Sequence, residues 1–175
     1  RGARGAARSR RRPLSRDVSA LLAGAAGHDT EAFGRAEREL IEQGLGAPRI
    51  LECGAARVAI FPGFGRSDDA DSFVETDDGF IACAGTLFYR GLGGADALRA
   101  LGRDFESPSS WSPDDPWGNY AVAIAKDGRL WLATDRLGMV KLYERPAQRL
   151  VSTSWLACVA AGPRSTLDRL GALDY

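Results

Sequence analysis

From residue 49 onward, hydrophobic and polar residues alternate with a period close to two, in short runs rich in β-branched and aromatic side chains. This alternation is typical of β-strands, because successive side chains point to opposite faces of a sheet. Asp127-Gly128 lies between two such runs and predicts a tight hairpin turn. The pattern predicts strands over residues 49–53, 57–61, 72–76, 79–89, 119–125, 129–135, 140–144 and 150–154.

Apolar residues at helical spacing mark other parts of the chain. The segment 28–46 predicts a helix with Asp29 or Thr30 as N-cap, and Gly44 and Gly46 end it. Further helical patterns cover residues 94–105, 154–162 and 166–175. Helices that bracket antiparallel strands predict an α+β fold built in layers.

Length and composition are those of a globular protein. A chain of 175 residues that is 45% hydrophobic suits one domain with a sizeable core. The longest apolar runs are far shorter than the roughly 20 residues that cross a bilayer, and the first residues lack the apolar core of a signal peptide. We therefore expect a cytoplasmic protein with no membrane partner.

Cysteine and histidine usage argues against metal sites and familiar triads. Cys53, Cys83 and Cys158 are odd in number and widely spaced, which predicts neither a disulfide framework nor a zinc site. His28 is the single histidine, and no cysteine or acid stands near it at ligand spacing. We expect no metal ligand and no Ser/His/Asp triad.

The first sixteen residues contain seven arginines and no acidic residue. We interpret residues 1–16 as a disordered, Arg-rich tail and residues 17–175 as a single domain. The alternative is that the tail binds nucleic acid or an acidic partner, since arginines neutralise phosphates regardless of sequence. The tail has no aromatic residue to stack on a base, which favours the first interpretation.

The stretch Leu130–Glu144, "LWLATDRLGMVKLYE", places an Asp-Arg-Leu-Gly turn between two β-rich runs. Asp135 and Arg136 end one strand, and Gly138 offers a left-handed residue from which the chain starts the next. Turn chemistry and a local ion pair explain this unit without catalysis. We therefore predict a structural role for these three residues, at a sheet edge that faces a partner.

The run "WGNYAVAIAKDGRLWLATDRLGMVKLYE", followed by "RLVSTSWLACVA", resembles the glutaminase half of asparagine synthetase-type proteins. That half is a class II glutamine amidotransferase, in which a Gly-aromatic-Ala hairpin precedes an Asp-Arg-x-Gly turn, a Leu-Tyr strand and a Ser-Ser-type helix entry. The resemblance covers residues 79–161 and implies an N-terminal-nucleophile (Ntn) hydrolase fold. Such a fold is an αββα sandwich of two antiparallel sheets between helix layers.

The nucleophile of that family is a cysteine at the mature N-terminus, where its own α-amino group serves as base. This chain begins at Arg1, and Cys53-Gly54 lies too close to the strand that contains Arg57 to be the start of the domain. We interpret Cys53 as a buried structural cysteine and Cys83 as core filler. We assign no catalytic residue.

The family's substrate motif, Asn-Gly-Glu-Ile-Tyr-Asn, corresponds to Ala84–Tyr89, and of its residues Gly85 is kept. The resemblance also suggests Arg57 as a residue that meets a substrate carboxylate, although an exposed strand arginine explains it equally well. Since the amide and the carboxylate of the motif are replaced by Ala84 and Thr86, we expect glutamine hydrolysis to be lost.

Three functional hypotheses follow. The favoured one is a noncatalytic glutaminase-like domain, inactive alone, which scaffolds the synthetase of an asparagine synthetase-related, amide-forming ligase, as in natural-product pathways. The synthetase domain or subunit would use ATP and Mg²⁺ to adenylate a carboxylate that an amine then attacks. This chain lacks the Ser-Gly-Gly-x-Asp-Ser loop, so no cofactor is expected in it. A homodimer is the other assembly considered. The alternatives are an active Ntn amidohydrolase with a processed nucleophile, and nucleic-acid or acidic-partner binding through the tail.

Overall fold

The computed structural model describes residues 19–61, 71–107, 109 and 116–163. Within these residues the strands form two antiparallel sheets. The first sheet has the order β2-β3-β1-β10-β9, and the second has the order β4-β5-β7-β8 with β6 paired to β5. The strands of the first sheet are β1 (Ala20–Gly24), β2 (Arg49–Cys53), β3 (Ala56–Phe61), β9 (Tyr143–Arg145) and β10 (Leu150–Ser152). Those of the second are β4 (Phe73–Thr76), β5 (Gly79–Tyr89), β6 (Leu92–Gly93), β7 (Trp117–Lys126) and β8 (Arg129–Thr134).

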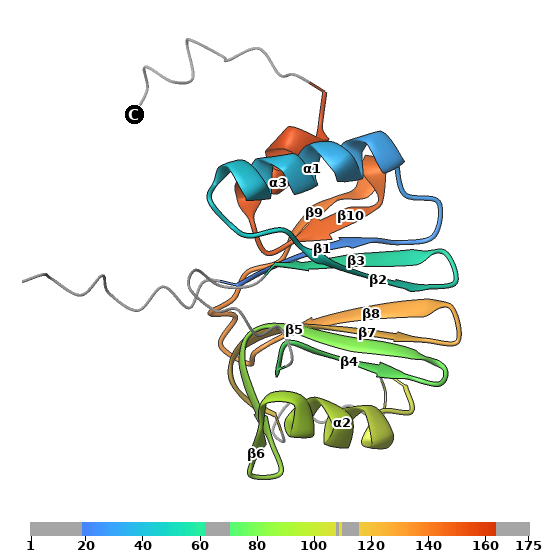
Figure 1. Ribbon diagram of the computed structural model, residues 1–175, viewed down its shortest axis with the longest axis vertical. Helices are drawn as coiled ribbons and strands as arrows, with labels where there is room; N and C mark the ends of the chain where they lie inside the picture. Colours follow the sequence, from blue (N-terminus) through green and yellow to red (C-terminus); the bar gives the residue numbers. More distant parts are fainter. Residues whose placement is uncertain (1–18, 62–70, 108, 110–115, 164–175) are drawn as a thin grey trace, which may run out of the picture.

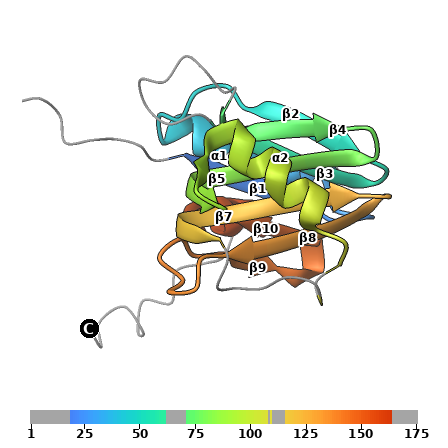
Figure 2. The ribbon, with the colours of Figure 1, turned by 90° about the horizontal axis from the view of Figure 1, so that it is seen from below.

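The two sheets stack face to face, with helices on their outer faces (Figure 1). Helices α1 (Thr30–Glu42) and α3 (Trp155–Ala161) cover the first sheet. Helix α2 (Gly94–Asp104) lies across the outer face of the second sheet (Figure 2). The described part of the chain is therefore four layers deep, and the predicted α+β class with antiparallel sheets is confirmed.

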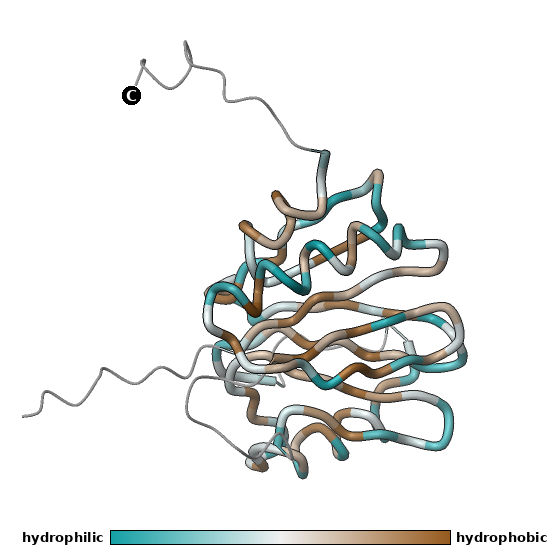
Figure 3. Tube along the Cα trace, turned by 45° about the horizontal axis from the view of Figure 1, so that its top comes forward, coloured by the Kyte–Doolittle hydropathy of each residue, from teal (hydrophilic) through white to brown (hydrophobic). Residues whose placement is uncertain are grey.

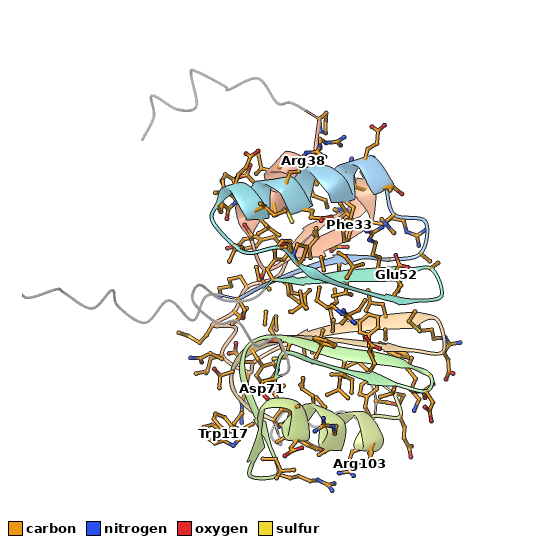
Figure 4. All side chains as sticks on the ribbon, viewed as in Figure 1. Phe33, Arg38, Glu52, Asp71, Arg103 and Trp117 are labelled. Atoms are coloured by element: carbon orange, nitrogen blue, oxygen red, sulfur yellow. The ribbon has the colours of Figure 1, made fainter. Side chains whose placement is uncertain are left out.

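Hydrophobic positions concentrate along the strands, and hydrophilic ones lie at the hairpin ends (Figure 3). A central cluster fills the space between the sheets, and it includes Leu21, Val58, Phe80 and Ala123. Two further clusters join each sheet to its helices. In α1, Phe33 points inward and Arg38 outward (Figure 4). Burial of these apolar faces is the main force that holds the layers together.

The predicted helices and turns agree with the structure where it describes them. Asp29 is the N-cap of α1, and its Oδ1 accepts a hydrogen bond from the Ala32 amide at 3.0 Å. Asp127 and Gly128 have φ of 51° and 73°, as the tight turn of a hairpin requires. The last helical pattern, 166–175, and the tail, 1–16, lie outside the described residues.

Several elements differ from the prediction: β6 was not expected, β10 is shorter than 150–154, and β9 and β1 differ most. The strand expected over 140–144 is shortened to β9, because residues before it remain in the turn that Asp135 organises. Strand β1 was not predicted at all. It is made of Ala, Leu and Gly, which carry little β-propensity, and it has no alternation since both of its faces are buried. Leu21 faces the second sheet and Leu22 faces the helices.

Candidate functional site

A cavity of about 630 Å³ lies at the beginning of β1. It gathers residues from both sheets, from the end of α1, from the turn that follows β8 and from the entry to α3. Its walls are formed by Ser19, Ala20, Leu40, Gln43, Leu45, Gly85, Thr86, Asn119, Met139, Val140, Lys141, Tyr143, Thr153 and Ser154. A pocket with apolar walls and converging polar groups is the usual form of a small-molecule site.

Ser19 lines this cavity and directly precedes β1 in the chain. Its Oγ accepts a hydrogen bond from the backbone amide of Gly85 at 2.7 Å. Gly85 has a φ of 97°, and a Cβ added there would overlap the backbone oxygen of Asn119. Only glycine fits this conformation and this close approach of β5 to β7. Gly85 therefore fixes Ser19 to the second sheet.

Hydroxyl groups in and next to the cavity wall hold β1 to β10 and to the segment that follows it. Thr153 Oγ1 accepts a hydrogen bond from the amide of Leu21 at 3.0 Å. The buried Ser152 donates its hydroxyl to the carbonyl of Leu21 at 3.0 Å. Ser154 caps α3 by accepting from the Ala157 amide at 3.4 Å. These hydroxyls are thus committed to the fold.

Gln43 donates from Nε2 to Glu39 and accepts at Oε1 from Ser154. The polar side chains that remain in the cavity wall are Thr86, Asn119, Lys141 and Tyr143. Lys141 is the only charged residue of the lining that the structure describes, and that lining contains no thiol, imidazole or carboxylate. Across the described residues, no group of three or more His, Cys, Asp or Glu is arranged to hold a metal ion. The arrangement offers binding contacts rather than an obvious nucleophile and base.

Asp135 lies beside the cavity and organises one of its walls. Its side chain is buried, and its Oδ1 accepts hydrogen bonds from the amides of Leu137 at 3.1 Å and Met139 at 3.0 Å. Its Oδ2 accepts from the amide of Val140 at 3.0 Å. Burial opposes ionisation, but these hydrogen bonds outweigh it and hold the pKa of Asp135 below its usual value.

The other two residues predicted for this turn are placed as follows. Gly138 has a φ of 59°, in the expected left-handed region, and its amide donates to the Asp135 carbonyl at 2.9 Å. Arg136 is exposed at the surface of the turn. Behind the turn, Tyr120 is buried, and burial followed by the charge of Asp135 raises the pKa of Tyr120 to about 12.

The two residues suggested for substrate binding do not lie together. Gly85 lines the cavity. Arg57 lies opposite Gly24 in the register of β1 and β3, at the end of β1 that is farther from the cavity. The Arg57 guanidinium stacks over the Phe33 ring at 5.1 Å and meets Glu52 at 3.7 Å. Arg57 therefore packs against α1 and does not reach the cavity.

None of the three cysteines lines the cavity. Cys53 is half-buried rather than buried as expected, because it ends β2 beside the β7–β8 hairpin, where its Sγ accepts from the Gly128 amide at 3.4 Å. Cys83 fills the core as predicted, and burial raises the pKa of its thiol to about 12. Cys158 is buried in α3, and burial also raises its pKa.

Sequence reasoning missed Ser19 and Lys141 as site residues. Ser19 depends on β1, and β1 lacks the alternation that reveals strands. Lys141 depends on the turn that brings residues 139–143 over the end of the sheets. The one available signal was the apolar run 20–24 directly after a serine.

Comparisons of this chain with protein-family models, curated proteins and solved structures give no match. The described helices include none with the length and apolarity needed to cross a membrane. What the fold and cavity define is thus an α+β domain with a polar-rimmed cavity where two antiparallel sheets meet. The family resemblance of residues 79–161 remains a prediction.

Proposed function

We propose that this chain is a noncatalytic, glutaminase-like domain with an Ntn-hydrolase-like αββα sandwich, which scaffolds an asparagine synthetase-related ligase. The layered arrangement of two antiparallel sheets between helices supports this assignment (Figure 1). So does the succession of a hairpin, an Asp-Arg-x-Gly turn, a strand and a serine-capped helix. ATP and Mg²⁺ belong to the synthetase partner in this proposal.

The observation that carries the noncatalytic part is the state of the cavity at the start of β1. A nucleophile of the Ntn type needs a free α-amino group as its base. In this proposal Ser19, directly before β1, takes the position of that nucleophile, but its nitrogen belongs to the Val18–Ser19 peptide bond in this sequence. Its hydroxyl and those of Thr153 and Ser154 serve the fold through the hydrogen bonds described above.

The scaffolding part is supported by apolar side chains that are exposed around the cavity. Leu137 is 80% exposed and Met139 63% exposed, both in the turn that Asp135 organises. Trp155 is 58% exposed at the start of α3, next to the cavity residue Ser154. Exposed aromatic and aliphatic residues close together are typical of protein interfaces. In this proposal they contact the synthetase domain or subunit.

The test is co-purification with a synthetase encoded next to this chain, which the proposal requires, with amide-bond formation as a second readout. Leu137→Asp should weaken co-purification at unchanged thermal stability, because the side chain is exposed. Asp77→Ala, a change in an exposed turn at the far end of the second sheet, is the matched control. Equal co-purification of the Leu137→Asp variant and the unaltered chain would exclude this surface as the contact, and no ligase partner at all would refute the proposal.

A second candidate, an active Ntn amidohydrolase with a processed nucleophile, is favoured by the position of Ser19. Cleavage of the Val18–Ser19 bond would leave a serine hydroxyl and its own α-amino group at the cavity. Mass spectrometry of the mature protein decides between the candidates. A chain that begins at Ser19, with amide hydrolysis that Ser19→Ala abolishes, would replace the noncatalytic proposal. A mature chain that retains residues before Ser19 would exclude this candidate.

A further inference from the structure

The cavity at the start of β1 keeps polar groups that the fold does not use. The side chains of Thr86, Asn119, Lys141 and Tyr143 line it, and none has a hydrogen-bond or ion-pair partner among the described residues. Their neighbours in the wall, Ser19, Thr153 and Ser154, all have such partners. The uncommitted groups supply an ammonium, an amide and two hydroxyls, which are sufficient to hold one polar head group.

The charge of the cavity selects the sign of that head group. Lys141 is the only charge in the described lining, and no carboxylate there balances it. A ligand with one negative charge is therefore attracted, and a ligand ammonium would face Lys141 with no counter-charge. A single lysine suits a carboxylate better than a phosphate, since phosphate sites usually combine several positive groups or oriented backbone amides.

The remaining walls select the body of the ligand. Leu45 lies just after the end of α1, and Met139 and Val140 close the opposite side. Transfer of an aliphatic group from water to such walls is favourable by roughly 25 cal/mol per Å² of apolar surface. The volume of about 630 Å³ leaves ample room for a branched aliphatic chain.

We propose that this cavity binds an aliphatic monocarboxylate that carries no free ammonium group. The carboxylate lies at Lys141, with Asn119 and Tyr143 as further donors, and the aliphatic body contacts Leu45, Met139 and Val140. The ligand is bound and not cleaved. The inference goes beyond the scaffolding role and needs no synthetase partner, so the failure of one does not entail the failure of the other.

The experiment uses the single methionine of the chain, Met139, as a reporter in the cavity wall. Full-length protein labelled with ¹³C at the methionine methyl gives one native signal once residues added for expression are removed. The probes are isocaproate, its neutral amide isocaproamide, and leucine, which is isocaproate with an added α-ammonium. Saturable movement of the Met139 signal on titration measures binding.

We expect isocaproate to bind about three- to fivefold more tightly than isocaproamide or leucine, because an ion pair of a solvent-exposed lysine is worth up to about 1 kcal/mol. Lys141→Gln should weaken isocaproate binding by about the same factor. Lys126→Gln is the matched control, because Lys126 is the other lysine of the chain and pairs with Asp78 at 3.4 Å in a distant hairpin. Both variants should keep the native melting temperature, since both lysine side chains reach solvent.

Three results would overturn the proposal. The Met139 signal does not move with isocaproate at tens of millimolar, or isocaproamide binds as tightly as isocaproate, or Lys141→Gln binds isocaproate as the unaltered protein does. Binding of leucine in preference to isocaproate would show that the ligand carries an ammonium, which also refutes the stated class.

Discussion

Replacement of Asp135 by alanine tests the structural role of the turn after β8. The buried carboxylate accepts three backbone hydrogen bonds, from Leu137, Met139 and Val140. A hydrogen bond to a charged group contributes about 1.5–3 kcal/mol. Because Leu137 and Met139 lie at the surface, water replaces part of the lost bonding. We therefore expect Asp135→Ala to lower the free energy of unfolding by about 3 kcal/mol, and the melting temperature by about 9 °C.

Asp135→Asn tests the hydrogen bond accepted by Oδ2 separately from the two accepted by Oδ1. The amide oxygen can still accept from Leu137 and Met139, but the amide nitrogen then stands where Oδ2 accepted from Val140, so two donors face each other. The expected loss is about 2 kcal/mol, between the alanine variant and the unaltered protein. Urea titrations followed by far-UV circular dichroism and tryptophan fluorescence measure both variants.

The pH dependence supplies a second readout. Burial alone would raise the pKa of Asp135, but the amide hydrogen bonds lower it below the unfolded value of about 3.9. The ionised carboxylate therefore contributes stability above that pH, and the contribution is lost as pH falls through the lower folded pKa. The stability gap between the unaltered protein and Asp135→Asn should be complete at neutral pH and shrink below about pH 4.

Asp77→Ala is the control, because Asp77 is exposed, and its effect should stay within about 0.5 kcal/mol. An Asp135→Ala variant that is destabilised no more than this control would refute the structural interpretation of the turn. Loss of a hydrolytic activity at unchanged stability would point instead to a catalytic role for Asp135.

Three further predictions follow from the same geometry. Gly85→Ala should destabilise the protein by more than about 2 kcal/mol, since the added Cβ overlaps Asn119 at a positive φ; thermal melts measure this, and a native melting temperature would contradict it. In thiol titration near pH 8, half-buried Cys53 should react in the native state, whereas Cys83, with a pKa of about 12, should react only after unfolding. Deletion of residues 1–16 should leave the melting temperature unchanged, and it should abolish nucleic-acid binding, with its steep salt dependence, if the tail hypothesis holds; binding that survives the deletion would exclude the tail as its source.

Local sequence signals were sufficient for much of the fold. Asp29 predicted the start of α1 because an N-cap needs only a side-chain oxygen near the first free amides. Asp127-Gly128 predicted its hairpin because few residue pairs adopt positive φ twice in succession. The runs that form β3, β5, β7 and β8 were readable because each contains β-branched or aromatic residues, which favour strands.

Apart from Gly85, the residues of the candidate site could not be predicted from such local signals. Gly85 and Arg57 were expected to serve one substrate, but the antiparallel register of β1 and β3 sets Arg57 opposite Gly24, at the far end from Ser19. Register depends on which strands pair, and a residue's neighbours across a sheet are not encoded next to it in the chain. Lys141 and Ser19 are more than a hundred positions apart and line one cavity.

Strand β1 shows most clearly the difference between what the sequence determines locally and what the tertiary structure decides. By itself the sequence determined where the helices are capped, where the hairpin turns and which runs are rich in strand-forming residues, because these features depend on neighbouring residues. Ala20–Gly24 has no such local signature and becomes the central strand of its sheet because β3, β10 and two layers of side chains enclose it. Only the tertiary structure decided that this strand exists, and the position of the cavity follows from it.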